Sequence, residues 1–339
     1  MAGGEEAPEP AHGASAPDPG GVPTVTVGVA TKNRLDALVR CLRSLRLLEG
    51  LVAEAVVVDD GSDVPVEGPA RAALAADLPP AARFIRHEAS RNLSACRNRI
   101  AREARTPWLL NLDDDAFVVS RRAVETAVAV LESDPSVAAV AFAQCGANGE
   151  PYGPAEQPLP VDYPAYAPTF IGYAHLLRRD AFLAVGGFRE RMGINGEEKE
   201  LSLRLLDRAW RVVYLPGACI AHVAHQGNRD RRRYLQQVAR NDVLAALYDH
   251  PFPLVVAGAA VRLWRYFPMR KGWGIDDPGG FGTLVRGVAR ELPGVLRDRT
   301  PVRWSTLRRW RAMTGAAPEP YTGPGLAAAA RAPATEPAA

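Results

Sequence analysis

Short apolar runs alternate with stretches of helical periodicity along most of the chain, and several of the runs end in polar turns. Runs rich in Val, Ile and Leu predict strands at residues 25–30, 54–60, 83–87, 108–112, 137–143 and 173–178. Apolar residues at helical spacing predict helices at residues 35–45, 94–104 and 123–131. Strands that alternate with helices favour a mostly parallel sheet covered on both faces. The predicted fold class is therefore an open, Rossmann-like α/β sheet flanked by helices.

The second half of the chain has a less regular pattern. Residues 145–168 are rich in Pro, Gly and Tyr, which predicts an irregular loop. Further elements are expected as a helix at 197–209, strands at 211–215 and 218–221, a long basic helix at 230–248 and amphipathic Arg-rich segments to about residue 313. The expected organisation is a disordered tail at 1–22, an α/β domain at 23–228, a basic helical extension at 229–314 and a disordered tail at 315–339.

Charge is nearly balanced overall but uneven along the chain. The formal net charge is only +3 over 339 residues, so binding to a nucleic acid is not expected. Basic residues are concentrated between residues 229 and 311, where Trp264, Tyr266, Phe267 and Trp273 lie among them. This composition suits contact with an anionic membrane surface or a lipid-linked acceptor. A packed helical cap with a solvated basic face fits it equally well.

No segment predicts secretion or a membrane span. The N-terminal residues have neither a basic start nor an apolar stretch, and no apolar run reaches the roughly 18–20 residues that a span needs. The four cysteines, Cys41, Cys96, Cys145 and Cys219, are widely separated and form no Cys-x-x-Cys pair or zinc spacing. They predict free, mostly buried thiols in a reducing compartment, and hence a cytoplasmic protein.

Three consecutive carboxylates, Asp113, Asp114 and Asp115, directly follow a predicted strand. Adjacent carboxylates repel one another. A divalent cation removes that cost, and hard cations prefer carboxylate oxygens. When such a cation also contacts a diphosphate, it offsets the charge that develops on the leaving group. The alternative interpretation is an acidic cap for the helix that follows.

A second acidic pair, Asp59 and Asp60, ends another predicted strand and is followed by Gly61. A carboxylate here can accept hydrogen bonds from a base or a ribose, whereas the alternative is an ordinary Asp-Gly turn. Ligands of open α/β sheets bind beyond the carboxyl ends of the strands. We therefore expect this pair to converge with residues 113–115 at one edge of the sheet.

Two further segments carry candidate ligand-binding groups. Arg97 and Asn98 lie near the start of a predicted helix, where an anion site is favoured, although a capped helix with a solvated Arg explains them as well. Gly186 and Gly187 precede Phe188 and allow close backbone approach near a sugar.

Two acids and a histidine complete the candidate chemistry. Glu197 and Glu198 open a predicted helix, where either can act as a general base or simply complement the helix dipole. His222 follows the last short strand and can complete a metal shell, with His225 as a competitor, or serve a structural role.

These segments, in this order, resemble family 2 glycosyltransferases of the GT-A fold. The resemblance runs from about residue 24 to 222, and it rests on the ordered set VTVGVATKNR, VVVDDGS, SACRN, LNLDDDA, RRDAFLAVGGF, GEEKELSLRL, VVYLP and AH. It implies a single inverting displacement of a UDP- or dTDP-linked sugar by an acceptor hydroxyl or amine, in cell-envelope glycan or secondary-metabolite synthesis.

The resemblance also implies roles for individual residues. The nucleotide-sugar site would comprise Thr31, Arg34, Asp59, Asp60, Arg97, Asn98, Asp113 and Asp114. Asp113 and Asp115 match the ends of the family's DxD motif, with Asp115 the direct ligand of Mn²⁺ or Mg²⁺ and His222 closing the metal site. Glu198 takes the place of the family's general base.

Three positions depart from the family pattern. Glu197-Glu198 replaces the usual Glu-Asp, so that the base is either of the two glutamates. Asn92 stands where a Gly is usual before the Ser-Ala run, and Trp210 stands where a small residue is common.

Three other classes of protein are alternatives to this interpretation. A sugar nucleotidyltransferase would carry a Gly-rich loop after the first strand, but residues 30–35 contain no glycine. A dinucleotide-dependent oxidoreductase would carry GxGxxG there, which is also missing. A non-catalytic sugar-nucleotide-binding protein remains open.

Overall fold

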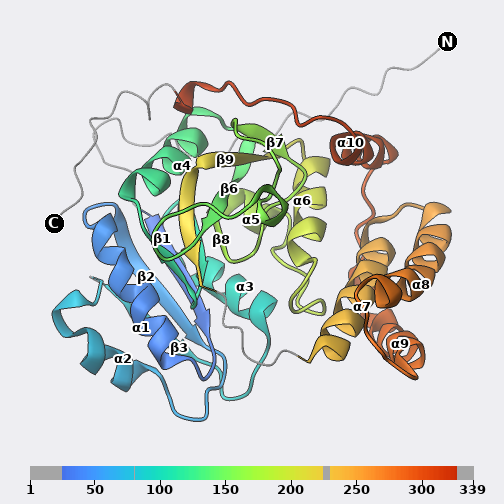
Figure 1. Ribbon diagram of the computed structural model, residues 1–339, viewed down its shortest axis with the longest axis horizontal. Helices are drawn as coiled ribbons and strands as arrows, with labels where there is room; N and C mark the ends of the chain where they lie inside the picture. The colour runs from blue at the N-terminus through green and yellow to red at the C-terminus, as the bar shows by residue number, and fades with distance from the viewer. Residues whose placement is uncertain (1–24, 80, 224–229, 327–339) are drawn as a thin grey trace.

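Strands and helices alternate along the chain largely as the apolar pattern predicts. The computed structural model describes residues 25–79, 81–223 and 230–326 (Figure 1). The strands are β1 Val25–Thr31, β2 Val52–Asp59, β3 Arg83–Arg86, β4 Trp108–Asp113, β5 Ala116–Val118, β6 Val137–Cys145, β7 Ala165–Ala167, β8 Ala174–Arg178 and β9 Arg211–His222. The helices that flank them are α1 Leu35–Ser44, α2 Glu67–Leu74, α3 Leu93–Glu103, α4 Arg121–Ser133, α5 Arg179–Ala184 and α6 Glu197–Asp207.

All the described strands join one sheet, in the order β3-β2-β1-β4-β8-β6-β9-β5, with β7 paired to β9. Strands β1, β2, β3, β4, β6 and β9 point in one direction, and β5, β7 and β8 run against it. The sheet is thus mostly parallel, and the predicted fold class is confirmed.

Apolar side chains cover both faces of the sheet and produce three layers. On one face the core includes Leu38 and Leu42 of α1 together with residues of α2 and α4. On the other face it includes Ile100 of α3 and Leu201 of α6 together with α5. Burial on both sides explains why the strand residues are almost uniformly apolar rather than alternating.

The carboxyl ends of the central strands bring distant polar residues together. β1 lies between β2 and β4, so that Thr31 pairs with Asp59 and Ala30 pairs with Asp113. The expected convergence of the acid groups at 59–60 and 113–115 is therefore present at one edge of the sheet.

Four longer helices follow the α/β region: α7 Arg231–Asp249, α8 Leu254–Gly272, α9 Gly280–Asp298 and α10 Trp304–Gly315. In Figure 1, α7, α8 and α9 form a group beside the sheet, and α10 lies nearer α6. Leu307 and Trp310 of α10 pack on Leu203 and Leu206 of α6. Among the described residues, no helix combines the length and apolar character that crossing a bilayer requires.

Several element boundaries differ from the prediction. Two expected short strands form the single strand β9, because a register shift opposite Phe142 and Ala143 accommodates Pro216 and Gly217 without ending the pairing. Residues 316–326, expected to begin a disordered tail, lie against the domain: Pro320 bridges to Ala165, and Tyr321 is buried in the core. The predictions for residues 1–22 and 327–339, and for His225, fall outside the described residues.

The prediction of four free thiols is wrong for one pair. Cys145 and Cys219 form a disulfide with their Cα atoms 6.1 Å apart. The parallel pairing of β6 with β9 places Ala143 opposite Cys219 and Cys145 opposite Ala221, so that the two cysteines become neighbours. Only Cys41 and Cys96 are free and buried as expected.

Candidate functional site

A cavity of about 420 Å³ opens at the carboxyl edge of β1 and β4. Its walls come from the ends of β1, β4 and β9, the start of α3, the start of α6 and the segments around residues 171–173 and 194–195. The predicted site residues that line it are Thr31, Arg34, Asp60, Arg97, Asp113, Asp114, Asp115, Glu197, Glu198 and His222. Asp59 and Asn98 are not among its lining residues.

The three aspartates at the end of β4 do not cap a helix. They lead into β5, and α4 begins only at Arg121. Asp114 is held by Thr31 Oγ1 at 2.8 Å and by Arg34 at 2.6 Å. Burial nevertheless raises the pKa of Asp114 to about 7, although Arg34 and then Thr31 lower it. Arg34 also pairs with Asp115 at 2.7 Å, so one guanidinium offsets part of the charge of two adjacent carboxylates.

Asp115 and His222 face each other across a gap that suits a cation. Asp115 Oδ1 lies 3.6 Å from His222 Nε2, which is too far for a hydrogen bond. His222 Nδ1 lies 2.8 Å from Gln144 Oε1, and the amide nitrogen of Gln144 donates to the Glu156 carbonyl. The amide oxygen therefore accepts a hydrogen bond from Nδ1–H, which leaves Nε2 as the ring nitrogen that can bind a cation beside the carboxylate.

This donor set fits Mn²⁺ or a similar divalent ion. A carboxylate oxygen and an imidazole nitrogen that both offer lone pairs are ligands, not partners for each other. Gln144 fixes the histidine tautomer as an outer-shell group does in many metal sites. Tyr173 stacks on the same imidazole at 4.7 Å between ring centroids and fixes the orientation of the ring.

A second group, Asp60, His87 and Cys96, also brings three donor atoms within 4.8 Å of one another. The Asp60 carboxylate already accepts hydrogen bonds from the backbone of Arg91 and Asn92, from Ser90 Oγ and from His87 Nδ1. These bonds hold the pKa of Asp60 below its usual range, although burial raises it. Burial raises the pKa of the Cys96 thiol. A carboxylate whose oxygens are occupied and a protonated thiol are weaker candidates than Asp115 and His222.

Asp59 does not line the cavity, and its carboxylate instead binds the turn that follows β2. Its carboxylate accepts from the backbone nitrogens of Ser62 and Val66, at 2.8 and 3.3 Å, and pairs with Arg86 at 2.6 Å. These contacts fix the turn that follows β2. The ordinary turn interpretation therefore accounts for the contacts of Asp59.

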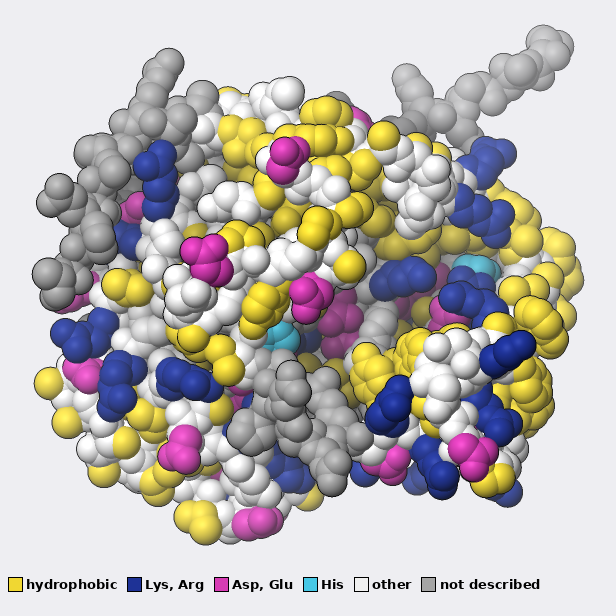
Figure 2. All heavy atoms as spheres, viewed as in Figure 1, with side chains coloured by type: hydrophobic (Ala, Val, Ile, Leu, Met, Phe, Trp, Pro, Cys, Tyr) yellow, Lys and Arg dark blue, Asp and Glu magenta, His cyan; other side chains and the backbone are white. Residues whose placement is uncertain are grey.

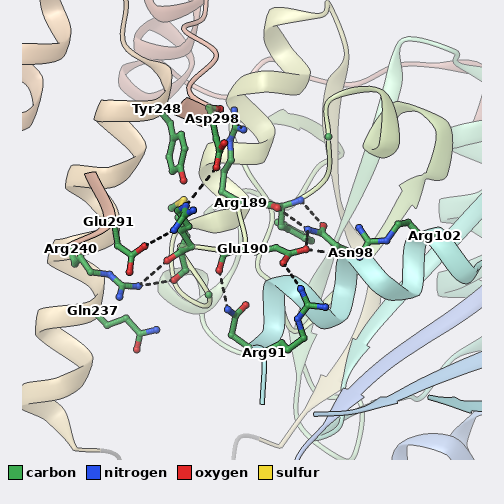
Figure 3. Close-up of a pocket in the computed structure, with 16 residues that line it drawn as sticks. Arg91, Asn98, Arg102, Arg189, Glu190, Gln237, Arg240, Tyr248, Glu291 and Asp298 are labelled. Carbon is green, nitrogen blue, oxygen red and sulfur yellow. Dashed lines mark hydrogen bonds and ion pairs between the residues drawn. The ribbon is translucent and has the colours of Figure 1, made fainter. Parts of the chain in front are cut away.

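Asn98 lies on a different and larger cavity, of about 820 Å³, between α3, residues 186–193 and the helices α7 and α9 (Figure 3). Its amide exchanges hydrogen bonds with the backbone of Phe188, at 2.8 and 2.9 Å. A Cβ on Gly187 would lie 2.5 Å from Asn98 Oδ1, so the close approach that this glycine permits is to Asn98. Figure 3 shows Glu190 reaching toward Arg91 and Asn98, which makes this cavity largely a network of ion pairs.

Two of the backbone N–H groups at the start of α3 are already hydrogen-bonded within the protein. Asn92, which replaces the usual glycine, has a φ of 86° and accepts a hydrogen bond from Ala95 N at 3.1 Å. This φ, together with a ψ of 166°, lies in a region that favours glycine, so the backbone of Asn92 is strained while its side chain caps the helix. The backbone N–H of Ser94 donates to Gly193.

Arg97 turns from α3 into the cavity. It pairs with Asp113 at 2.8 Å, donates to the Gly172 carbonyl at 2.6 Å and lies 3.4 Å from Glu197. It is fully buried, and these acids favour its charged form. Arg97 therefore places a fixed positive charge between the end of β4 and the start of α6.

The two glutamates at the start of α6 occupy different environments. Glu197 is 0% exposed, and burial, reinforced by repulsion from Glu198, raises its pKa well above the usual range. Glu198 is half-buried and lines the cavity. A Cβ on Gly172 would lie 2.2 Å from Glu198 Oε1 and 3.1 Å from Arg97 Nη1, so a glycine at 172 leaves room for both side chains.

Three residues of the site were not singled out from the sequence: Gln144, Gly172 and Tyr173. Gln144 lies in an apolar strand and has a partner 78 residues away. Gly172 falls outside any glycine motif. The one available signal was the polar Gln144 inside the otherwise apolar run of β6.

Residues 26–189 match the sequence model of the family described as Glycosyl transferase family 2. The pre-mycofactocin glycosyltransferase of Mycobacterium tuberculosis is 30% identical over 267 residues, which cover 74% of this chain and 54% of that protein. The succinoglycan biosynthesis protein ExoO of Rhizobium meliloti is 39% identical over 98 residues, 29% of this chain and 27% of that protein. This chain thus spans about half the length of the mycobacterial relative.

Solved structures share the architecture at low sequence identity. The mannosyltransferase PcManGT of Pyrobaculum calidifontis, in complex with GDP-Man and Mn²⁺, has a TM-score of 0.53 and 20% identity and covers 93% of this chain and 88% of its own. A fragment of S. aureus TarS in complex with UDP-GlcNAc has a TM-score of 0.55 and 16% identity and covers 80% of this chain and 84% of its own. These similarities concern the fold.

Proposed function

We propose, from the premise that this chain belongs to glycosyltransferase family 2 and has the GT-A fold, that it transfers a sugar from a metal-bound nucleoside diphosphate sugar to an acceptor hydroxyl or amine with inversion. The observation that supports the proposal is that the Asp115–His222 pair and Glu198 line the same cavity. Such a meeting supplies a cation site for the leaving group and a base for the acceptor.

The donor is proposed to lie along the carboxyl edge of β1 and β4. When bound, a divalent cation held by Asp115 and His222 would neutralise the charge that builds on the departing diphosphate. Arg34 is one-third exposed in its side chain and already pairs with two carboxylates there. It is free to exchange one of them for a phosphate oxygen. The base of the donor is proposed to be uracil or thymine.

Glu198 is proposed as the general base. It takes the proton of the acceptor hydroxyl as that oxygen bonds to the anomeric carbon, while the bond from that carbon to the phosphate oxygen breaks and the diphosphate leaves. Glu197 suits this task poorly, because it is fully buried and burial raises its pKa well above the usual range. Glu197 instead supports Arg97.

The test is a panel of UDP-, dTDP- and GDP-linked sugars incubated with the protein, with Mn²⁺ or with EDTA. We expect release of nucleoside diphosphate from a UDP- or dTDP-linked donor, and EDTA should abolish it. Donor binding without release would favour the non-catalytic binder. Pyrophosphate release from a nucleoside triphosphate and a sugar phosphate would favour a nucleotidyltransferase.

Peripheral membrane contact is proposed for the outer face of α8. Val256 and Trp264 are each 66% exposed and Val261 is 57% exposed. Phe252, just before the helix, is 77% exposed, whereas Tyr266 is buried. An apolar face with tryptophan on a basic helical unit suits the interface of an anionic bilayer.

Sedimentation with phosphatidylglycerol vesicles tests this contact. We expect the protein to pellet with these vesicles and not with phosphatidylcholine vesicles, and Trp264→Ser should weaken the affinity for the vesicles roughly 30-fold, since burying a large apolar side chain contributes on the order of 2 kcal/mol. Equal recovery of the wild type and Trp264→Ser in the pellet would contradict the proposal.

A further inference from the structure

A third cavity, of about 670 Å³, adjoins the 420 Å³ cavity, and α6, α7, α8 and α10 contribute to its walls. It shares Ile171, Asn195 and Glu198 with the 420 Å³ cavity. Figure 2 shows the hollow between the main body and the C-terminal helices, with dark blue and magenta side chains within it. Because Glu198 borders both cavities, a molecule in the 670 Å³ cavity can present a hydroxyl to this carboxylate.

The C-terminal helices place an excess of positive charge on the 670 Å³ cavity. Arg262 and Arg265 of α8 both pair with Asp242 of α7, at 3.2 and 2.9 Å, so that two guanidinium groups share one carboxylate. Lys199 and Arg311 also line the cavity. The side chain of neither residue makes a hydrogen bond or ion pair with any of the residues that the structure describes.

Apart from Glu198, the remaining acids of this cavity do not cancel the excess. Glu200 forms ion pairs with Arg189 and Arg204, at 3.1 and 2.5 Å. Burial raises the pKa of Asp249 well above its usual range, which favours its uncharged form. The pKa of His250 is lowered to about 4, first by burial and then by the nearby Arg262.

Another wall of the same cavity is apolar. Leu203 of α6 packs against Leu307 and Trp310 of α10, and Phe170 and Met269 also line the space. A ligand that fills the cavity therefore meets cationic side chains and an apolar, partly aromatic surface. Binding sites of this kind combine apolar contact with a few polar groups that fix orientation.

We infer that the 670 Å³ cavity binds the acceptor, and that the acceptor carries an acidic group, a carboxylate or a phosphate ester, beside an apolar body. Arg311 receives the acid, with Arg262 and Arg265 supporting it, and the acceptor hydroxyl lies at Glu198. This inference rests on the proposed function of Glu198. It assigns acceptor selection to α8 and α10, outside the region of residues 26–189 that matches the family.

Binding of three matched probes tests the inference: 4-hydroxybenzoate, 4-hydroxyphenyl phosphate and the neutral 4-hydroxybenzamide. Their dissociation constants are measured by NMR titration of the full chain with Mn²⁺ and saturating UDP or dTDP, so that the nucleotide fills the 420 Å³ cavity. We expect at least one acid to bind on the order of tenfold more tightly than the amide, because its contacts are charge-assisted. The two acids distinguish a carboxylate-bearing acceptor from a phosphorylated one.

The matched variants are Arg311→Gln and Arg308→Gln, two charge removals on α10. Arg308 is exposed and does not line the cavity. Arg311→Gln should remove the preference for the acid and leave the affinity of the amide unchanged, whereas Arg308→Gln should behave as the wild type. Equal affinities for acid and amide, no binding of either acid, or an unchanged preference in Arg311→Gln would overturn the inference. Failure of the nucleotide to bind would instead count against the proposed function.

Discussion

Replacing Glu198 by Gln should lower the rate of sugar transfer by about 10²–10⁴-fold, the range that a positioned general base contributes. The amide has nearly the same shape but cannot accept the proton of the acceptor. Donor binding should persist, since Glu198 lies at the start of α6, whereas Asp115 and His222 lie at the ends of β4 and β9. The measurement is kcat for transfer together with the dissociation constant of the donor.

Glu197→Gln is the matched control, one residue away on the same helix turn. Glu197 is fully buried and its pKa is raised by burial, so a neutral amide reproduces its favoured form. We expect a loss of less than about tenfold in kcat, arising from the altered contact with Arg97. If Glu197→Gln is inactive and Glu198→Gln is active, the roles of the two glutamates are reversed.

Replacing Asp115 by Asn should remove metal-dependent turnover, with a loss of roughly 10³-fold in kcat/KM, because the Lewis-acid contribution is several kcal/mol. The substitution keeps the shape of the side chain and removes the anionic ligand opposite His222. The measurement is the dependence of nucleoside diphosphate release on Mn²⁺ concentration.

Asp114→Asn provides the comparison, since it makes the same change one residue earlier. Asp114 is bound to Thr31 and Arg34, and burial raises its pKa to about 7. A neutral amide therefore resembles a form that Asp114 already populates near neutral pH, and we expect a much smaller loss than in Asp115→Asn. Equal losses in both variants would show that the carboxylates act as a charged cluster rather than through Asp115.

The sheet was predictable because its strands are short, apolar and bounded by polar turns. β2 and β4 were placed to within two residues, and their acidic ends then located the site through the rule for open α/β sheets. The ordered motifs added the family, which Asp59 or Asp113 alone would not have indicated. Glu197 and Glu198 remained equivalent in sequence, since only burial separates them.

What the sequence did not provide depends on contacts between distant residues. The disulfide joins cysteines 74 residues apart and follows from the register of β6 with β9. Residues 316–326 look like a tail by composition, yet Tyr321 packs into the core of the sheet. Asn98 has the residue type expected beside a nucleotide, but its partner is the backbone of Phe188.

The central claim is that the cation and the diphosphate meet at the end of β4. Crystals of the wild type grown with Mn²⁺ and UDP, with diffraction recorded at the manganese absorption edge, locate the ion directly. The account predicts an anomalous peak in contact with Asp115 and His222, bridged to the diphosphate. A peak among Asp60, His87 and Cys96, or a bound diphosphate with no manganese beside Asp115, would contradict it.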